Sequence, residues 1–530
     1  MSKEFTMEEV SKHNTPQDLW IVIDNEVFDV TEWQNTHPGG KKMLQKVGGK
    51  DATKFFHKYH DAANVMRKFG QQFKIGQVSA NAASGALTAN KAIAHFERLD
   101  EYGDMIPYAD PLWYQGFFSP FHNETHAQLR DLIRDYCDTK LAPFIDEWEA
   151  NQQIPESAYR EWGQAGFLAL ACGGHGEFPI EYCDYKFGHI LPHDQIDPFH
   201  TAILGDELSR VGSGGLVWFL IGGFGIGLPP VLNYASAEVK KRIVPGILAG
   251  EKRICLAITE PRGGSDVANL ETEAVKTDDG KHFIVNGVKK WITNGIWADY
   301  FSVAVRTGKP GMGGISMLLI EKTMPGVNVR KIQTQGVRCS GSTYIEFEDV
   351  KVPVGNLIGP ENGGFKVIMS NFNQERMGVV TQAIRFSRVC YEDSVKWAHQ
   401  RETFGVKLIK HDVIRNKLAQ MACRIESVQA LFDALVFQYS QMDRDEAMLR
   451  LGGNIAGLKA HSTQVYEYCA REASQIFGGL AYTQGGKGGR VERLYRDVRS
   501  LAIPGGSEEI MLDLSIRQSL KVHEMFGAKL

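Results

Sequence analysis

Thr259-Glu-Pro-Arg-Gly-Gly-Ser-Asp266, followed further along by Trp291-Ile-Thr-Asn-Gly295, is the part of this sequence that decides the fold. The first motif is a loop between strand-like runs, and the second directly follows another such run. Hydroxyl groups, backbone amides exposed by glycine, and a tryptophan face suit a planar, polar ring system such as isoalloxazine. Either motif alone is typical of ordinary surface loops, so the hypothesis rests on the pair.

The residues around these motifs indicate a strand-rich middle domain over 251–362. Its clearest strand-like runs are 283–288, 300–305 and 316–320, which are rich in apolar and β-branched residues. Helical periodicity dominates 121–250 before it and 363–530 after it. A chain of 530 residues is too long for a single core, so we expect several domains in the order small module, helices, strands, helices.

Taken together, the two motifs resemble the acyl-CoA dehydrogenase family, and the resemblance extends over residues 121–526. It implies an α-helical domain at 121–250, a β-sandwich or barrel at 251–362, an α-helical bundle at 363–530, and FAD as cofactor. It also implies which residues contact the FAD: Thr259, Gly264, Ser265, Trp291, Thr293, Arg401, Thr403, Phe404, Gln475, Gly478, Gly479, Ser507 and Glu509.

Two further motifs resemble the family's contacts to a neighbouring subunit. Arg401-Glu-Thr-Phe-Gly405 and Gln475-Ile-Phe-Gly-Gly479 match segments that bind the adenosine and pyrophosphate of the neighbour's FAD. Arginine forks pair well with phosphate oxygens, and glycine permits close backbone approach. The resemblance therefore implies a homodimer or homotetramer. Asp412 stands where the family usually has a glutamine, which puts that adenosine contact in doubt.

The catalytic base is the most informative departure from the common family pattern. Desaturating a thioester needs a carboxylate to remove the α-proton while hydride leaves Cβ for flavin N5. The usual glutamate lies in a C-terminal loop, as Tyr-Glu-Gly-Thr, but here the loop reads Pro504-Gly-Gly-Ser507. We expect one helix to begin near Gly364 and to carry Glu375 on its apolar stripe. The residues of that stripe are Phe365, Ile368, Phe372, Val379, Ala383 and Phe386.

A carboxylate on a buried helix face marks a candidate functional site, because it must be paired or have a raised pKa. A structural ion pair with Arg376 is the alternative interpretation. The motif Asn373-Gln-Glu-Arg376 resembles the isovaleryl-CoA and long-chain branches of the family, which carry the base at this helix position and glycine or alanine in the loop. This resemblance makes Glu375 the predicted base, with Glu508 and Glu509 as alternatives. It also implies that three residues contact the acyl-CoA: Ser265, Arg376 and Gly505.

The N-terminal module carries His37-Pro-Gly-Gly40, then Gly48-Gly-Lys-Asp-Ala-Thr53, and then His57 and His60. Two facing imidazoles can bind a haem iron, and glycines allow close approach to the macrocycle. On a helix starting near residue 51, His60 falls at the edge of the apolar stripe and His57 faces away. The module resembles cytochrome b5 over residues 5–78, so we predict a haem b bound by His37 and His60, followed by a linker over 79–120.

Composition excludes several other classes of function. The net charge of −4, without a basic stripe, argues against nucleic-acid binding. No run approaches the length of a membrane span, and the eight cysteines are scattered singly, as in reduced intracellular proteins. Histidines 175, 189, 193 and 200 with Cys183 lack the spacing of a metal site, which favours a family-specific insertion. The ending Ala528-Lys529-Leu530 resembles a peroxisomal address, with the cytoplasm as the alternative location.

We therefore expect an oxidoreductase that converts an acyl-CoA to its 2,3-enoyl thioester and passes electrons from FAD to the fused haem. An acyl-CoA oxidase, with oxygen as acceptor, is the alternative within enzymes. A non-catalytic, acyl-CoA-binding electron carrier is the alternative outside them. A separate electron-acceptor protein is a further possible partner.

Overall fold

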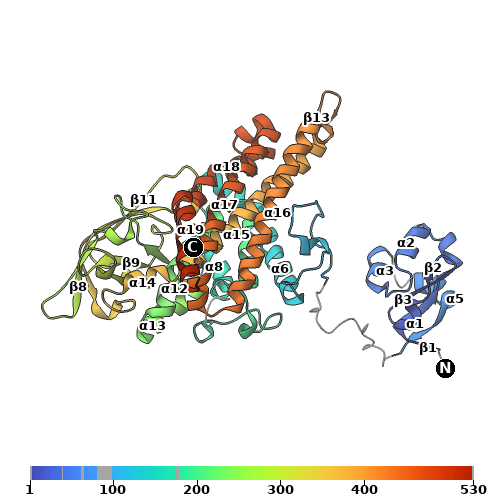
Figure 1. Cartoon of the computed structure of the whole chain (residues 1–530), viewed down its shortest axis with the longest axis horizontal. Coiled ribbons are helices and arrows are strands. Elements are labelled where there is room, and N and C mark those ends of the chain that lie inside the picture. Colours follow the sequence, from blue (N-terminus) through green and yellow to red (C-terminus); the bar gives the residue numbers. More distant parts are fainter. Residues whose placement is uncertain (1–2, 39, 61–64, 80–97, 174–177, 528–530) are drawn as a thin grey trace. The chain divides into compact units, whose positions relative to one another are not determined.

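The computed structural model describes residues 3–38, 40–60, 65–79, 98–173 and 178–527. It divides into two compact units, Met1–His95 and Phe96–Leu530, each of which is described by itself (Figure 1). The ending Ala528-Lys529-Leu530 lies outside the described residues.

The first unit is built on a five-stranded sheet with the order β1-β5-β4-β3-β2. Strand β3 alternates its side chains between two small cores, as the two-residue period of a strand requires. Leu19, Ile21 and Ile23 pack with Phe28 on one side, whereas Val22 packs on the other. The elements are β1 (Glu4–Phe5), α1 (Met7–Ser11), β2 (Asn14–Thr15), β3 (Asp18–Ile23), β4 (Glu26–Asp29), α2 (Lys41–Lys46), α3 (Thr53–Tyr59), α5 (Gln71–Phe73) and β5 (Lys74–Val78).

The second unit begins with an extended segment, residues 98–122, which we call the strap. Its Tyr114 is buried, and the Tyr114 hydroxyl donates a 2.7 Å hydrogen bond to Glu207. Arg385 donates to Asp110 over 2.8 Å, so the strap is held by an ion pair as well. The sequence predicts a linker over 79–120, but these contacts make residues 98–120 part of the packed second unit.

Helices dominate the next part of the chain, where the sequence predicts a helical domain over 121–250. Four of them begin with a side-chain cap, from Asn123, Asp197, Ser213 or Ser236, which satisfies backbone amides at the helix start. The helices are α6 (Glu124–Tyr136), α7 (Ile145–Asn151), α8 (Glu156–Gln164), α9 (Phe167–Leu170), α10 (Pro198–Arg210), α11 (Gly214–Val217), α12 (Gly223–Tyr234) and α13 (Ala237–Leu248).

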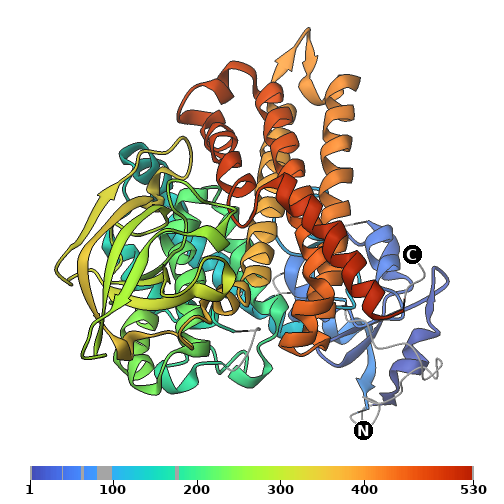
Figure 2. The same ribbon diagram turned by 60° about the vertical axis from the view of Figure 1, so that its left-hand side comes forward.

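A seven-stranded sheet forms the middle of the second unit, and Figures 1 and 2 show the helices of the C-terminal part running beside it. Its path is β10-β9-β7-β8-β12-β11, with β6 paired to β9. The three strand-like runs predicted from sequence fall in β8, β9 and β10. The strands are β6 (Ile254–Ala257), β7 (Glu273–Lys276), β8 (His282–Ile292), β9 (Tyr300–Arg306), β10 (Ile315–Glu321), β11 (Val327–Lys331) and β12 (Thr343–Pro353).

The C-terminal part consists of long helices, and the sequence prediction of one continuous helix from Gly364 is wrong at one point. Helix α14 ends at Met369, and α15 begins at Phe372. At the break, the Ser370 hydroxyl donates to the carbonyl of Val367 over 2.8 Å, and serine and asparagine side chains of this kind compete with helix hydrogen bonding. The elements are α14 (Gly364–Met369), α15 (Phe372–Gln400), β13 (Glu402–Thr403), β14 (Val406–Lys407), α16 (Asp412–Gln441), α17 (Arg444–Phe477), α18 (Gly489–Ala502) and α19 (Glu508–Met525).

One helical stretch among the described residues, Gly214–Tyr234, is long and apolar enough to cross a membrane by length and composition alone. From the sequence we expect no run of that length. The stretch has a mean hydropathy of 1.8, and 61% of its apolar window is buried inside the unit. Burial of this kind is found in core helices that pack against other protein elements.

Candidate active site

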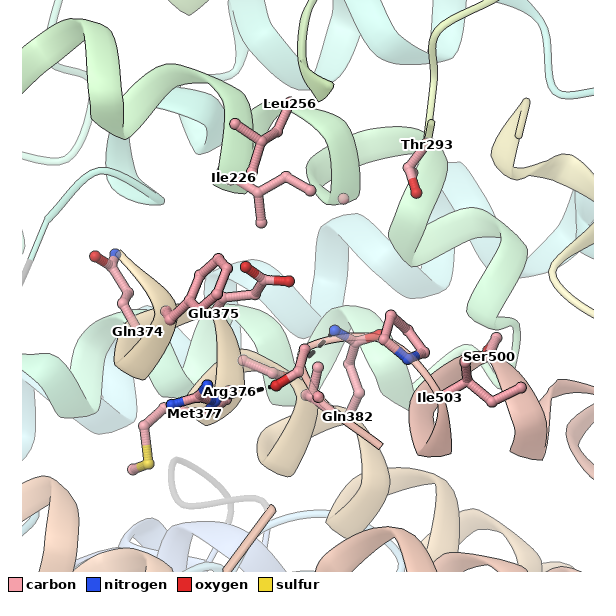
Figure 3. A pocket seen from close by; sticks show the side chains of 18 of the residues that line it. Ile226, Leu256, Thr293, Gln374, Glu375, Arg376, Met377, Gln382, Ser500 and Ile503 are labelled. Carbon is pink, nitrogen blue, oxygen red and sulfur yellow. Dashed lines mark hydrogen bonds between the residues drawn. The ribbon is translucent and has the colours of Figure 1, made fainter. Parts of the chain in front are cut away.

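A cavity of about 1010 Å³ opens between the helices and the sheet of the second unit. Its walls come from α10, α12, β6, the loop after β6, the start of α15 and the turn between α18 and α19. Figure 3 shows Glu375 pointing into this space, with Ile226 and Leu256 on one side and the segment of Ser500 and Ile503 on the other. The cavity therefore joins the predicted flavin motifs to the predicted base.

The loop that carries the first flavin motif is fixed by a buried ion pair. Lys289 of β8 lies 2.7 Å from the Glu260 carboxylate, and both side chains are almost fully buried. Glu260 also accepts hydrogen bonds from the amides of Glu271 and Thr272, at 2.6 and 2.9 Å. Burial alone would raise the pKa of Glu260, but Lys289 and these hydrogen bonds outweigh it and hold the pKa below its usual range. The ion pair thus holds the start of the loop against the sheet.

The second motif turns the chain sharply at the end of β8. Trp291 has a backbone φ of 60° and keeps 49% of its surface exposed, so its ring is available to a ligand. Asn294, at φ 62°, donates from Nδ2 to the carbonyls of Trp218 and Ser340 over 3.0 and 2.9 Å. These bonds fix the direction in which Thr293 enters the cavity.

The residues lining this part of the cavity fit a flavin. Thr259, Ser265, Trp291 and Thr293 all face it, as the sequence predicts, and so does Gly264. Within the described residues, the side-chain hydroxyls of Thr259, Ser265 and Thr293 are engaged by no other protein group. Free hydroxyls beside an exposed indole ring are the chemistry that a planar, polar ring system needs.

The environment of Glu375 is that of a buried acid beside two cations. Its Oε2 atom is shut off from solvent and has no hydrogen-bond partner among the described residues. Burial raises the pKa of Glu375, while the charges of Arg376 and Lys459 limit the rise. A carboxylate with a raised pKa and a free lone pair can accept a proton from a ligand in the cavity.

The loop position that usually carries the family's glutamate lies directly beside Glu375. A Cβ atom at Gly505 would lie 3.9 Å from Glu375 Oε1, and Gly505 has a φ of 68° that favours glycine. Arg376 does not form an ion pair that occupies Glu375; its Nε donates to the carbonyl of Gly505 over 3.0 Å (Figure 3). A side chain at position 375 of the helix and one at position 505 of the loop would thus reach the same point in the cavity.

The alternative bases have other surroundings. Glu508 accepts a 2.9 Å hydrogen bond from the Thr463 hydroxyl and does not line the cavity. Glu509 is exposed, and its own backbone amide and the Ser507 hydroxyl lower its pKa. Ser507, predicted to contact FAD, lines the cavity and caps α19 by accepting from the Ile510 amide.

The remaining predicted FAD contacts lie away from this cavity. The tip of the β13–β14 hairpin carries Phe404, which is 98% exposed at a φ of 52°, and it stands at the far end of the long helices (Figure 1). Arg401, Gln475, Gly478 and Gly479 are also exposed, and Thr403 bonds His411 over 3.0 Å. None of these residues lines the cavity of their own chain.

The first unit brings two histidines together. The ring centroids of His37 and His60 are 5.9 Å apart, close to the ~6 Å expected when two imidazoles bind one metal ion from opposite sides at metal–nitrogen distances of about 2 Å. The His60 Nδ1 lies 3.1 Å from the Phe56 carbonyl, which leaves its Nε2 for a metal. His57 instead lies 2.9 Å from Asp24 at the surface. The residues present therefore fit a bis-histidine haem.

Another histidine cluster has a structural explanation. His126, Asp197 and His200 are close enough to hold a metal ion, yet each histidine ring accepts a hydrogen bond from the backbone amide at the start of its helix. These are capping boxes for α6 and α10. His189 and His193 are not in the cluster, and His175 lies outside the described residues.

Comparison with known families follows the order of domains found here. Residues 6–79 match the family described as "Cytochrome b5-like Heme/Steroid binding domain". Residues 123–251, 255–350 and 362–520 match the N-terminal, middle and C-terminal domains of acyl-CoA dehydrogenase. The predicted fold class is thereby confirmed.

Individual relatives agree. "Acyl-CoA dehydrogenase apdG" of Emericella nidulans is 39% identical over 429 residues, which is 80% of this chain and 98% of the relative. "Acyl-CoA dehydrogenase AFT10-1" of Alternaria alternata is 40% identical over 79% of this chain and 97% of its own. Solved structures of acyl-CoA dehydrogenase from Geobacillus kaustophilus (30% identity, TM-score 0.67, 76% and 99% covered) and butyryl-CoA dehydrogenase from Megasphaera elsdenii (27%, 0.67, 75% and 99%) share the fold. The chain belongs to the FAD-dependent acyl-CoA dehydrogenase family of oxidoreductases and carries a haem-binding, cytochrome b5-like domain at its N-terminus.

Proposed function

We propose that this protein oxidises an acyl-CoA to its 2,3-enoyl thioester, with the Glu375 carboxylate as the base that removes the α-proton. The observation that carries the proposal is that Gly505, at the loop position where the family usually has its glutamate, lies directly beside the Glu375 carboxylate. The loop has lost the side chain that could act as a base, and a carboxylate from α15 points to the same place in the cavity.

The chain's own residues supply binding and proton transfer. We infer that Ser265, Arg376 and Gly505 contact the acyl-CoA, because all three line the cavity around Glu375. Arg376 supports the turn at Gly505 by its 3.0 Å hydrogen bond, and its charge favours the ionised form of Glu375. FAD, when bound, accepts the hydride that leaves Cβ.

Replacing Glu375 with glutamine tests the assignment. Glu375→Gln keeps the shape of the side chain but cannot accept a proton, so flavin bleaching by acyl-CoA under anaerobic conditions should fall by about 10²–10⁴-fold. FAD content should remain at the wild-type level. Glu508→Gln is the matched control and should retain bleaching; the reverse pattern would move the base to the α18–α19 turn.

We propose that the assembly is a homodimer or homotetramer in which one subunit completes the FAD site of the next. The exposed Arg401, Phe404, Gln475 and Gly478 support this, because these predicted FAD contacts lie away from their own cavity. Alanine at Phe404 should lower FAD retention without changing the cavity around Glu375, which equilibrium dialysis of FAD would reveal.

We further propose that the haem domain receives electrons from the flavin, because one chain joins a two-electron centre to a one-electron centre. A haem, when bound, takes electrons singly. An acyl-CoA oxidase, which would use oxygen, remains the second candidate, and the yield of hydrogen peroxide per turnover separates the two. Loss of flavin bleaching with every acyl-CoA tested would instead favour a non-catalytic electron carrier.

The location we propose is the peroxisome, on the ending Ala528-Lys529-Leu530. Deleting Leu530 should leave a fluorescent fusion in the cytoplasm. An intact fusion that is already cytoplasmic would refute the address.

A further inference from the structure

Lys459, in the middle of α17, is a fully buried lysine whose ammonium group binds backbone carbonyls. Its Nζ donates to the carbonyl of Ala502 over 3.0 Å and to that of Gly506 over 2.6 Å. Arg376 Nε takes the carbonyl of Gly505 between them. Two buried cations therefore bind three carbonyls, that of Ala502 at the end of α18 and those of Gly505 and Gly506 in the turn that follows.

This turn needs such support because its backbone carbonyls lack hydrogen-bond donors from the backbone itself. Carbonyls at the end of a helix lack amide partners from the next turn. Gly505 and Gly506 then take positive φ values of 68° and 101°, which carry the chain out of the helix before α19 begins. The same turn forms a wall of the cavity, since Gly505, Gly506 and Ser507 all line it.

The Lys459 side chain also passes near Glu375. Lys459 Cε and Glu375 Oε1 are each 3.9 Å from the point where a Cβ of Gly505 would stand, which puts them within about 8 Å of one another. Burial lowers the pKa of Lys459 to about 8, with Glu508 the largest opposing influence. Burial raises the pKa of Glu375, and Arg376 and Lys459 hold the rise back.

The other charges around Lys459 come from each helix packed on α17. Helix α15 contributes Glu375 and Arg376, and α19 contributes Glu508 and Glu509. Two ion pairs join carboxylates of α17 to cations of neighbouring helices: Glu467 with Arg499 of α18, and Glu472 with Lys417 of α16.

We propose that Lys459 is a positioning residue for the reaction, fixing the 502–506 turn as a wall of the acyl cavity and supplying the second positive charge beside Glu375. The proposal rests on Glu375 being the base. Lys459 touches neither substrate nor cofactor; it acts through the turn and through the ionisation of Glu375.

Three variants separate the effect of Lys459 on the 502–506 turn from the effect of its charge on Glu375. Lys459→Met removes both the charge and the donor, Lys459→Gln removes the charge but keeps a donor, and Lys459→Arg keeps both. Lys417→Met is the matched control, because it removes a lysine from an ion pair with the same helix away from the cavity. The assay is the rate of anaerobic flavin reduction against pH, with butyryl-CoA or octanoyl-CoA, whichever reduces the wild-type protein faster.

The acid limb of the profile should move up by about one pH unit in Lys459→Met and Lys459→Gln, since removing a nearby opposite charge favours the neutral carboxyl. Lys459→Arg and Lys417→Met should keep the wild-type limb. Hydrogen exchange of the Ile503, Gly505, Gly506 and Ser507 amides, which needs no turnover, should accelerate in Lys459→Met and much less in Lys459→Gln.

A rate that falls equally at every pH in Lys459→Gln, with no shift of the limb, would overturn the proposal. So would unchanged exchange of the turn in Lys459→Met. If Lys459→Met does not fold, the glutamine variant alone decides. Failure of the base assignment is recognised separately, because Glu375→Gln would then still reduce its flavin.

Discussion

Breaking the buried ion pair beneath the flavin loop should loosen that loop measurably. In Lys289→Met the Glu260 carboxylate loses its cation, which lies 2.7 Å away, but keeps its bonds from the Glu271 and Thr272 amides. Removing one partner of a buried pair costs about 3–5 kcal/mol. Because those hydrogen bonds remain, we expect the lower end, about 3 kcal/mol, which is roughly a 150-fold change in the local opening equilibrium.

Hydrogen exchange reports this opening directly, since exchange of a protected amide follows its local opening. The Glu271 and Thr272 amides should exchange about a hundredfold faster in Lys289→Met than in the wild-type protein. The difference should narrow as pH falls, because the unpaired Glu260 then takes up a proton and loses its charge.

The matched control is Lys276→Met, on the neighbouring strand. Lys276 pairs with Glu361 at 2.6 Å, but both side chains are more than a third exposed, so the pair is worth less than about 1 kcal/mol. Its exchange should change less than about fivefold. Adding Glu260→Gln to Lys289→Met should recover part of the protection. Equal exchange in Lys289→Met and the wild-type protein would refute the reasoning.

Three other predictions follow from the two units. His60→Ala should abolish the low-spin, six-coordinate haem spectrum and His57→Ala should preserve it; the opposite result would exchange their roles. After rapid anaerobic mixing with acyl-CoA, haem reduction should follow flavin reduction at a rate independent of protein concentration, and a second-order rate would contradict transfer within the assembly. Tyr114→Phe should lower stability by about 1.5–3 kcal/mol, because it leaves a buried bond to the Glu207 carboxylate unmade; an unchanged denaturant midpoint would show that this bond does not hold the strap.

Local sequence signals predicted much of the fold and the centre of the site. Strand-like runs were sufficient to predict β8, β9 and β10, because the apolar pattern that indicates a strand lies within each segment itself. Glu375, predicted as the base, does line the cavity although the helix is interrupted before it. That prediction rested on the glycine in the loop and on the resemblance of Asn373-Gln-Glu-Arg376 to one branch of the family. Helical periodicity alone distinguished His60, which lies beside His37, from His57, which pairs with Asp24.

The remaining features depend on partners far away in the sequence. The strap has the composition of a connecting segment, and its packing depends on Arg385, some 275 residues further along. Lys289 stands beside Lys290 on a strand, which from sequence resembles a solvated edge, until the sheet brings it onto Glu260. Nothing near Lys459 in the chain points to the carbonyls of the distant turn that it binds.

The close approach of Gly505 to Glu375 has a consequence for how such enzymes can diverge. If a glutamate stood at both positions at once, two carboxylates would share one small buried space, and one of them would be forced to hold a proton at neutral pH. If both positions lacked a carboxylate, the proton would have no acceptor. If Glu375 is the base, a lineage that moved its base between loop and helix would pass through a cavity with two carboxylates or with none, and a neighbouring cation such as Lys459 would stabilise the first of these states.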